Sequence, residues 1–72
     1  MKIIVTEFYT DNYILYQKDS LEFNSQNELI NYINFFFPDQ KTYSACEEGS
    51  PESIIRSVVD KTKFLHVEQS NN

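Results

Sequence analysis

The most reactive side chains in this chain are one histidine, one cysteine and a group of carboxylates. His66 has Glu68 two residues further along, in a segment typical of a strand. A catalytic base needs its carboxylate partner within hydrogen-bond reach, whereas residues two apart on a strand project side by side from one face. The chain has no second histidine to complete a zinc site. We therefore interpret His66 as a surface residue of a sheet.

The cysteine and the carboxylates beside it offer little chemistry. Cys46 has no histidine at a spacing that would make it a nucleophile, and Glu47 and Glu48 follow it directly. Negative neighbours disfavour the thiolate form and make a thiol less reactive. Together with Glu52, these carboxylates lack the alternating ligand spacing of a calcium loop, and a chain with one glycine cannot form a glycine-rich phosphate loop. We expect a protein without catalytic residues, metal or cofactor, and therefore not an enzyme.

The charge of the chain narrows the range of partners. The formal net charge is -5 at pH 7, whereas binding to nucleic acid normally needs a basic face or stripe. We expect no direct nucleic-acid binding and a protein partner with a basic surface. Mimicry of DNA is an alternative, but basic residues interrupt the acidic ones, so we favour a solvated, mixed surface. The acidic residues concerned are Glu47, Glu48, Glu52, Asp60 and Glu68, and the interrupting ones are Arg56, Lys61 and Lys63.

The sequence gives some indication of the cellular setting. The first ten residues contain one lysine and a short apolar run that soon meets Glu7, unlike a signal peptide or membrane anchor. One cysteine excludes an internal disulfide and fits a reducing compartment. We expect a soluble, cytoplasmic protein that does not bind membranes. Residues with A/T-rich codons are abundant, which favours a low-GC bacterium or one of its phages or mobile elements as the source.

The first half of the chain predicts a hairpin followed by a helix. Residues 2–9 and 13–23 are rich in β-branched and aromatic residues, and residues 10–12 have turn chemistry. The second strand is expected to be broken or bulged at Asp19 and Ser20. Ser25 and Glu28 form a capping box, and Pro38 ends a run with helical apolar spacing. We expect a helix over residues 26–37 whose apolar face consists of Leu29, Ile30, Ile33, Phe36 and Phe37.

The second half predicts a strand, a second helix and a last strand. Residues 41–48 are a plausible strand, and residues 63–69 are another, followed by a disordered tail at 70–72. Between them, Ser50 as cap and Pro51 at the first helical position favour a helix. Its apolar face would consist of Ile54, Ile55, Val58 and Val59. The order β-β-α-β-α-β predicts a single α+β domain over residues 1–69, with a four-stranded sheet and two helices on one face.

Three consecutive phenylalanines at the end of the first helix cannot all face the core. With about 100° per residue, Phe35 lies roughly 160° from the centre of the apolar face. Large aromatic residues at polar positions often anchor protein interfaces, but the helix could instead unwind before Pro38, or Phe35 could be one of the exposed apolar residues that every protein carries. Tyrosines around the hairpin turn are also suited to contacts. The candidate partner-binding residues are Tyr32, Phe35, Glu28, Tyr9, Tyr13, Tyr16, Glu47 and Glu48.

These observations predict a small acidic protein that works by binding another protein and occluding it. An inhibitor of a host nucleic-acid-handling or defence complex is the leading hypothesis. The alternative is an accessory or structural subunit that forms a homodimer over its open sheet face. Oligomeric mass separates the two, because a monomer with exposed aromatic residues favours the inhibitor and a tight dimer favours the subunit.

Overall fold

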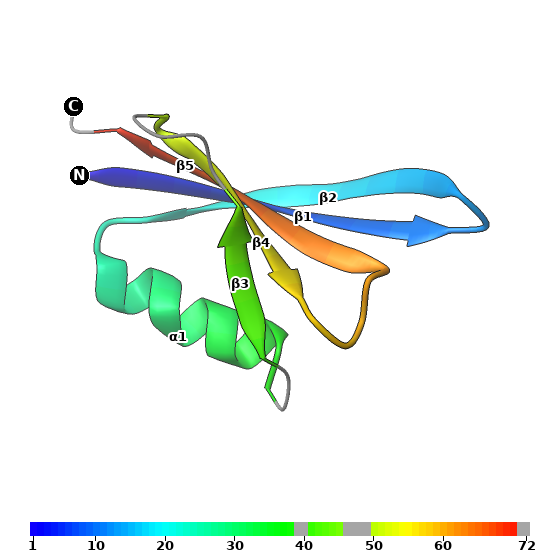
Figure 1. The fold of residues 1–72 in the computed structure, drawn as a ribbon. Helices are drawn as coiled ribbons and strands as arrows, with labels where there is room; N and C mark the ends of the chain where they lie inside the picture. The colour runs from blue at the N-terminus through cyan, green and yellow to red at the C-terminus, as the bar shows by residue number, and fades with distance from the viewer. Residues whose placement is uncertain (39–40, 46–49, 71–72) are drawn as a thin grey trace.

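The fold is a five-stranded antiparallel sheet with one helix (Figure 1). The computed structural model describes residues 1–38, 41–45 and 50–70. The strands lie in the order β2-β1-β5-β4-β3, so β2 and β3 form the two edges. The elements are β1 (Lys2–Asp11), β2 (Ile14–Phe23), α1 (Gln26–Phe36), β3 (Thr42–Ala45), β4 (Glu52–Ser57) and β5 (Lys63–Ser70).

The hairpin of β1 and β2 forms as the sequence predicts, with a turn one residue later than expected. Asp11 pairs with Ile14, which leaves Asn12 and Tyr13 as a two-residue loop with φ of 51° and 66°. Positive φ at both loop residues is the mark of a type I′ turn, whose twist matches that of the flanking strands. Figure 1 shows this hairpin projecting past the end of β5.

A β-bulge divides the hairpin into an inner and an outer half. The register shifts between the pairs Thr6–Ser20 and Phe8–Gln17. Two residues of β2, at positions 18 and 19, therefore face the single residue 7 of β1. This irregularity lies beside the position expected from the sequence.

Helix α1 confirms the predicted capping box. The Ser25 side chain accepts a hydrogen bond from the Glu28 amide over 3.3 Å, and Glu28 Oε2 accepts one from the Asn24 amide over 2.8 Å. The first bond satisfies one of the amide groups that a helix start leaves unpaired, and the second joins the residue before the N-cap to the first turn. The Phe37 amide donates to the carbonyl of Ile33 over 2.9 Å, and the chain leaves the helix there.

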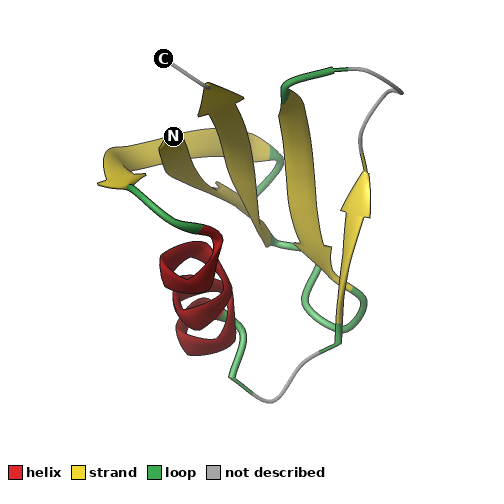
Figure 2. Cartoon of the chain, turned by 90° about the vertical axis from the view of Figure 1, so that its left-hand side faces the viewer, coloured by secondary structure: helices red, strands yellow, loops and turns green. Residues whose placement is uncertain are grey.

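The core lies between α1 and the inner half of the sheet. Figure 2 shows the helix packed on one side of the strands. Phe37 is buried there as predicted, and Ile33 and Phe36 are half-buried. Ile30 was expected in the apolar face but is 51% exposed, because the helix contacts the sheet through a stripe that runs past it. The buried core residues are Ile3, Val5, Leu29, Phe37, Leu65 and Val67.

The predicted second helix and four-stranded sheet are wrong. The segment that begins at Glu52 is strand β4, which pairs with β5 on one side and with β3 on the other. Ser50 does act as a local cap, because its hydroxyl accepts a hydrogen bond from the Glu52 amide over 3.2 Å. The β-branched Ile54 and Ile55 then favour the extended chain, and two neighbouring strands satisfy their backbone groups. Long-range pairing overrode the local helix signal.

Three other expectations can be compared with the structure only over the described residues. Strand β3 confirms a strand in the predicted segment 41–48, but residues 46–49 lie outside the described part of the chain. The last strand extends to Ser70, which pairs with Lys2, and residues 71–72 are not described. No helix in the described ranges is long and apolar enough to cross a membrane.

Candidate interaction surfaces

The helix carries the misplaced phenylalanine on its outer side. Phe35 is 77% exposed, as its helical position predicts. Tyr32 is half-buried, because its ring packs 5.4 Å from that of Phe23 and 6.2 Å from that of Phe35. The Glu28 carboxylate caps the helix at Asn24. Phe35 is therefore the exposed member of a small group of aromatic rings. The other two residues predicted to bind a partner on this helix support the fold: Tyr32 packs on Phe23, and Glu28 caps the helix.

Two of the three hairpin tyrosines stack on each other. Tyr9 and Tyr16 face each other across β1 and β2 with ring centroids 5.0 Å apart. The Lys18 ammonium group lies 5.6 Å from the centroid of the Tyr9 ring. Such cross-strand pairs stabilise a sheet by roughly 0.2–1 kcal/mol. The stack therefore stiffens the outer half of the hairpin while leaving both rings partly exposed.

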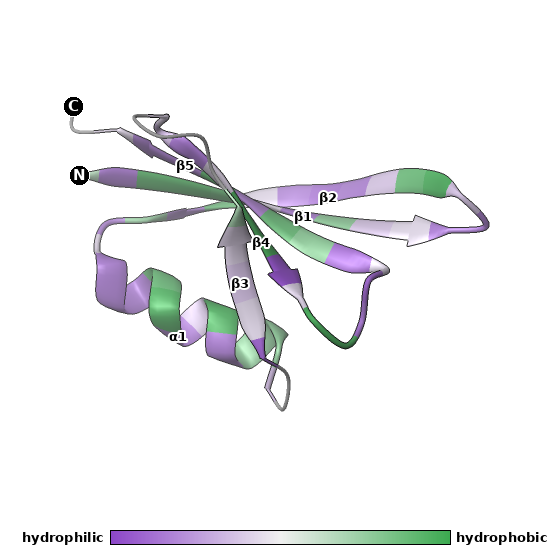
Figure 3. Ribbon diagram, in the orientation of Figure 1, coloured by the Kyte–Doolittle hydropathy of each residue, from purple (hydrophilic) through white to green (hydrophobic). Residues whose placement is uncertain are grey.

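The hairpin tip, residues 10–15, contains the most exposed apolar side chains of the hairpin. Tyr13 is fully exposed, and Ile14 and Leu15 are 55% and 56% exposed. Figure 3 shows the hydrophobic colour gathered at this end of β2, far from the helix. Tyr13 also has a positive φ, a conformation that costs a residue with a β-carbon roughly 1–2 kcal/mol and that glycine adopts freely. The tip therefore combines a strained backbone with an uncovered aromatic ring.

The hairpin is acidic and is anchored at one point to the neighbouring turn. Its charged residues are four carboxylates and two lysines. Thr10 donates to the carbonyl of Thr62 through its amide, over 2.6 Å, and through its hydroxyl, over 3.3 Å. In that turn, the side-chain and backbone hydrogen bonds from Thr62 hold the pKa of Asp60 below its usual value. The charged residues of the hairpin are Lys2, Glu7, Asp11, Lys18, Asp19 and Glu22.

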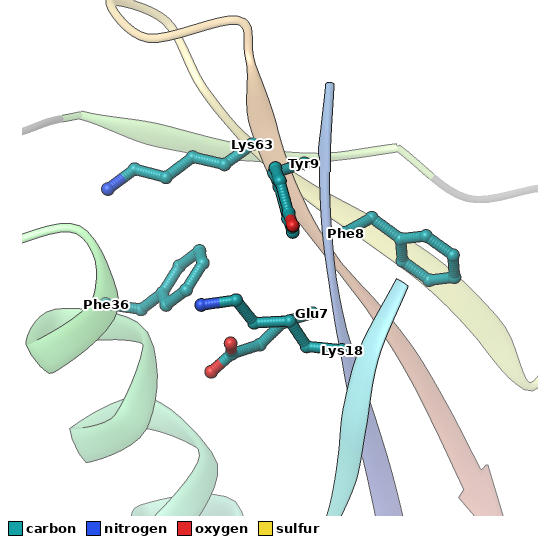
Figure 4. A pocket seen from close by; sticks show the side chains of 6 residues that line it. All are labelled: Glu7, Phe8, Tyr9, Lys18, Phe36 and Lys63. Carbon is teal, nitrogen blue, oxygen red and sulfur yellow. The ribbon is translucent and has the colours of Figure 1, made fainter. Parts of the chain in front are cut away.

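A cleft of 440 Å³ lies between the end of α1 and the sheet (Figure 4). Lys18 and Lys63 extend into it from strands on either side of β1, toward the ring of Phe36. Lys63 Nζ lies 5.1 Å from the centroid of that ring. The ring of Phe8 points to the opposite side of β1. The residues lining the cleft are Glu7, Phe8, Tyr9, Lys18, Phe36 and Lys63.

The opposite face of the sheet carries an aromatic row that the sequence did not predict. The rings of Phe8 and Phe64 stack 5.0 Å apart, and the Arg56 guanidinium lies 4.6 Å from the centroid of the Phe64 ring. Tyr43 faces Arg56 across the next strand pair and is half exposed. The incorrectly predicted helix, which was expected to start at Pro51, concealed this row, because Arg56 joins it only when β4 is a strand. The β-branched residues of that segment were the available signal.

Among the residues considered for chemistry, Glu52, His66 and Glu68 lie on the neighbouring strands β4 and β5. His66 lies opposite Ile54 of β4, and its Nε2 is 3.9 Å from Oε2 of Glu52, which itself lies opposite Glu68. In the described ranges, no group of three or more His, Cys, Asp and Glu side chains could hold a metal ion. Cys46, Glu47 and Glu48 lie outside those ranges.

Comparison with known proteins adds no functional assignment: no family model matches the chain, and neither a curated protein nor a solved structure does. The exposed tip, the cleft and the aromatic row are the features from which a function can be inferred.

Proposed function

We propose that the protein is a small, non-enzymatic protein-binding module that inhibits a partner by occluding its basic surface. The hairpin tip is the element that enters the partner. Tyr13 is the central anchor, and Ile14 and Leu15 provide apolar area around it. Partners of this kind include proteins that handle nucleic acids, since their binding faces are basic.

The observation that carries the proposal is the combination of strain and exposure at Tyr13. The residue is fully exposed and has a φ of 66°. Asparagine tolerates such a conformation, as Asn12 does in the same turn, but tyrosine does not favour it. Strained backbone conformations cluster at binding sites, where the side chain is kept for its contact with a partner rather than for the stability of the fold. A rigid aromatic side chain presented at the end of an arm is well suited to fill a pocket.

The charge of the hairpin supports a basic partner. Four carboxylates and two lysines give it a formal net charge of -2. Acidic side chains around an apolar contact accelerate association with a basic surface and make binding sensitive to salt. Asp11 at the tip and Asp19 at the bulge are both exposed, so they can act in this way.

A second candidate function is an accessory subunit that forms a homodimer. The aromatic row of Phe8, Phe64 and Tyr43 favours it, because no described element covers that face. Sedimentation equilibrium between micromolar and millimolar protein distinguishes the two functions. A tight dimer that dissociates in Phe64→Ser would replace the first proposal by the second, and a monomer over that range would exclude the second.

The test of the first proposal uses two substitutions at one position. Tyr13→Gly removes the side chain and relieves the backbone, whereas Tyr13→Ala removes the side chain and keeps the β-carbon. Proteins captured from an extract of the source cell are identified by mass spectrometry, purified, and titrated against each variant. Both variants should lose at least tenfold in affinity for the true partner, about 1.4 kcal/mol, while remaining folded.

The control is Ile30→Ala, which truncates a 51% exposed apolar residue on α1. Its affinity should match that of the wild type. A basic partner that binds the wild type, Tyr13→Gly and Tyr13→Ala equally would refute the tip as the binding element. An affinity that does not fall as salt rises would refute the electrostatic part of the proposal.

A further inference from the structure

The cleft between α1 and the sheet differs from the hairpin tip in its volume and in its charge. Its volume of 440 Å³ falls within the roughly 300–1,000 Å³ of small-molecule sites. Two lysines and one glutamate line it, so its formal charge is +1 in a chain of net charge -5. A third of the six basic residues of the chain thus converge on one hollow.

Both ammonium groups lie against aromatic rings, and the charge of Lys63 also helps to lower the pKa of Asp60, after the hydrogen bonds from Thr62. Lys63 Nζ lies 5.1 Å from the centroid of Phe36, and Lys18 Nζ lies 5.6 Å from that of Tyr9. Neither lysine forms a salt bridge with a carboxylate among residues 1–38, 41–45 and 50–70. Cation–π contacts hold a charge in place without cancelling it. The two cations are therefore available to an anion.

Phe36 and Glu7 also line the cleft, and they limit which kind of anion can bind there. The half-buried Phe36 ring lines the cleft, with the Lys63 ammonium group over it and the Tyr32 ring stacked 6.1 Å away. A planar ring of the ligand packs against Phe36 by displacing that ammonium group toward the phosphate. Glu7 is half-buried at the same site and can only accept hydrogen bonds when ionised. A bare anion would be repelled by Glu7, whereas a ligand with amino or hydroxyl donors would satisfy it.

We propose that this cleft binds a nucleoside monophosphate, with the phosphate held by Lys18 and Lys63 and the base packed on Phe36. Glu7 accepts a hydrogen bond from an amino or hydroxyl group of the nucleoside. The phosphate, the base and the hydrogen-bond donor of the nucleotide each have a matching group in the cleft. A simple carboxylate or phosphate ion would use only the two lysines. The site lies on β1, β2, β5 and α1 and is separate from the tip, so it stands whether or not the proposed function does.

The test is a titration of the isotopically labelled chain with AMP and GMP, followed by amide chemical shifts. Saturable shifts below about 1 mM should centre on residues 7–9, 17–19, 36–37 and 63. Adenosine and inorganic phosphate, used separately, should each bind at least tenfold more weakly than AMP. Equal binding of phosphate and AMP would mean that the ring contributes nothing and would overturn the proposal.

Variants connect the shifts to the proposed groups. Lys18→Ala and Lys63→Met should each weaken AMP binding at least tenfold, and Phe36→Leu should weaken it while keeping an apolar contact with the sheet. Lys41→Ala is the control, because Lys41 is exposed and does not line the cleft. Far-UV circular dichroism establishes that each variant is folded. No saturable shift up to about 10 mM nucleotide, or unchanged binding in both lysine variants, would overturn the proposal.

Discussion

Both halves of the β1–β2 hairpin contain apolar residues, but these residues are buried in the inner half and exposed in the outer half. In the inner half, Ile3 and Val5 are completely buried beneath α1. In the outer half, Ile14 and Leu15 are more than half exposed, although they are as apolar. The difference comes from the length of the helix, which spans only the inner half of the sheet (Figure 1). In the hairpin, the apolar residues that α1 covers are therefore core residues, whereas those of the tip are available for contacts.

The largest effect expected from this comparison concerns two leucines. Leu65 is completely buried in the core and Leu15 is 56% exposed at the tip. Leu65→Ala should lower the free energy of unfolding by about 2–5 kcal/mol, because it leaves a cavity. Leu15→Ala should change it by less than about 0.5 kcal/mol. Urea denaturation measures both, and equal losses would mean that the outer half belongs to the core.

The second prediction concerns helix α1, which covers the inner half of the hairpin. Ser25→Ala deletes the hydroxyl that accepts from the Glu28 amide, and should cost about 1 kcal/mol. Ser25→Asn, which retains an N-cap acceptor, should restore most of the loss. Because α1 buries the inner half only, hydrogen exchange should accelerate at Ile3 and Val5 before it changes at the tip. Uniform acceleration along β1 would contradict this division.

The third prediction concerns the strain in the outer half. Tyr13→Gly should raise the free energy of unfolding by about 0.5–1 kcal/mol, since the relief of a positive φ exceeds the entropic cost of glycine. Tyr13→Ala keeps the β-carbon and should bring no such gain. Thermal and urea unfolding of the two variants provide the comparison. A Tyr13→Gly variant no more stable than Tyr13→Ala would show that the positive φ at this position stores no strain that glycine relieves.

The smallest effect concerns the turn that anchors the outer half. The hydrogen bonds from Thr62 lower the pKa of Asp60 in the folded state, so the ionised carboxylate stabilises the turn above the unfolded pKa of about 3.9. That stability is lost as the pH falls through the lower folded pKa. The wild type should therefore lose more stability than Asp60→Asn between about pH 5 and pH 2.

Asp19→Asn is the matched control for this pH effect. Asp19 is exposed, and its carboxylate forms no hydrogen bond or ion pair with a described residue. Its variant should follow the pH dependence of the wild type in urea unfolding. If Asp60→Asn and Asp19→Asn cannot be distinguished below about pH 4, the Thr62 hydrogen bonds do not stabilise the turn.

Local sequence determined the hairpin and the helix. Ser25, Glu28 and Pro38 mark the two ends of α1, and the angle of Phe35 on that helix predicts its exposure. These features depend on residues a few positions apart, which interact whatever the rest of the chain does. The hairpin depends similarly on a short turn between two β-branched runs.

Tertiary structure decided the rest, and Glu52–Ser57 is the clearest case. Its serine cap and proline favour a helix locally, but the open edge of β5 offers backbone partners along the whole segment. These pairings run from Arg56–Phe64, 8 positions apart, to Glu52–Glu68, 16 positions apart, and local signals do not contain them. The same reason explains the cleft, because Lys18, Phe36 and Lys63 meet only after β2, α1 and β5 have packed around β1. The sequence alone determined which residues could form contacts, and the packing of β5 between β1 and β4 decided which of them do.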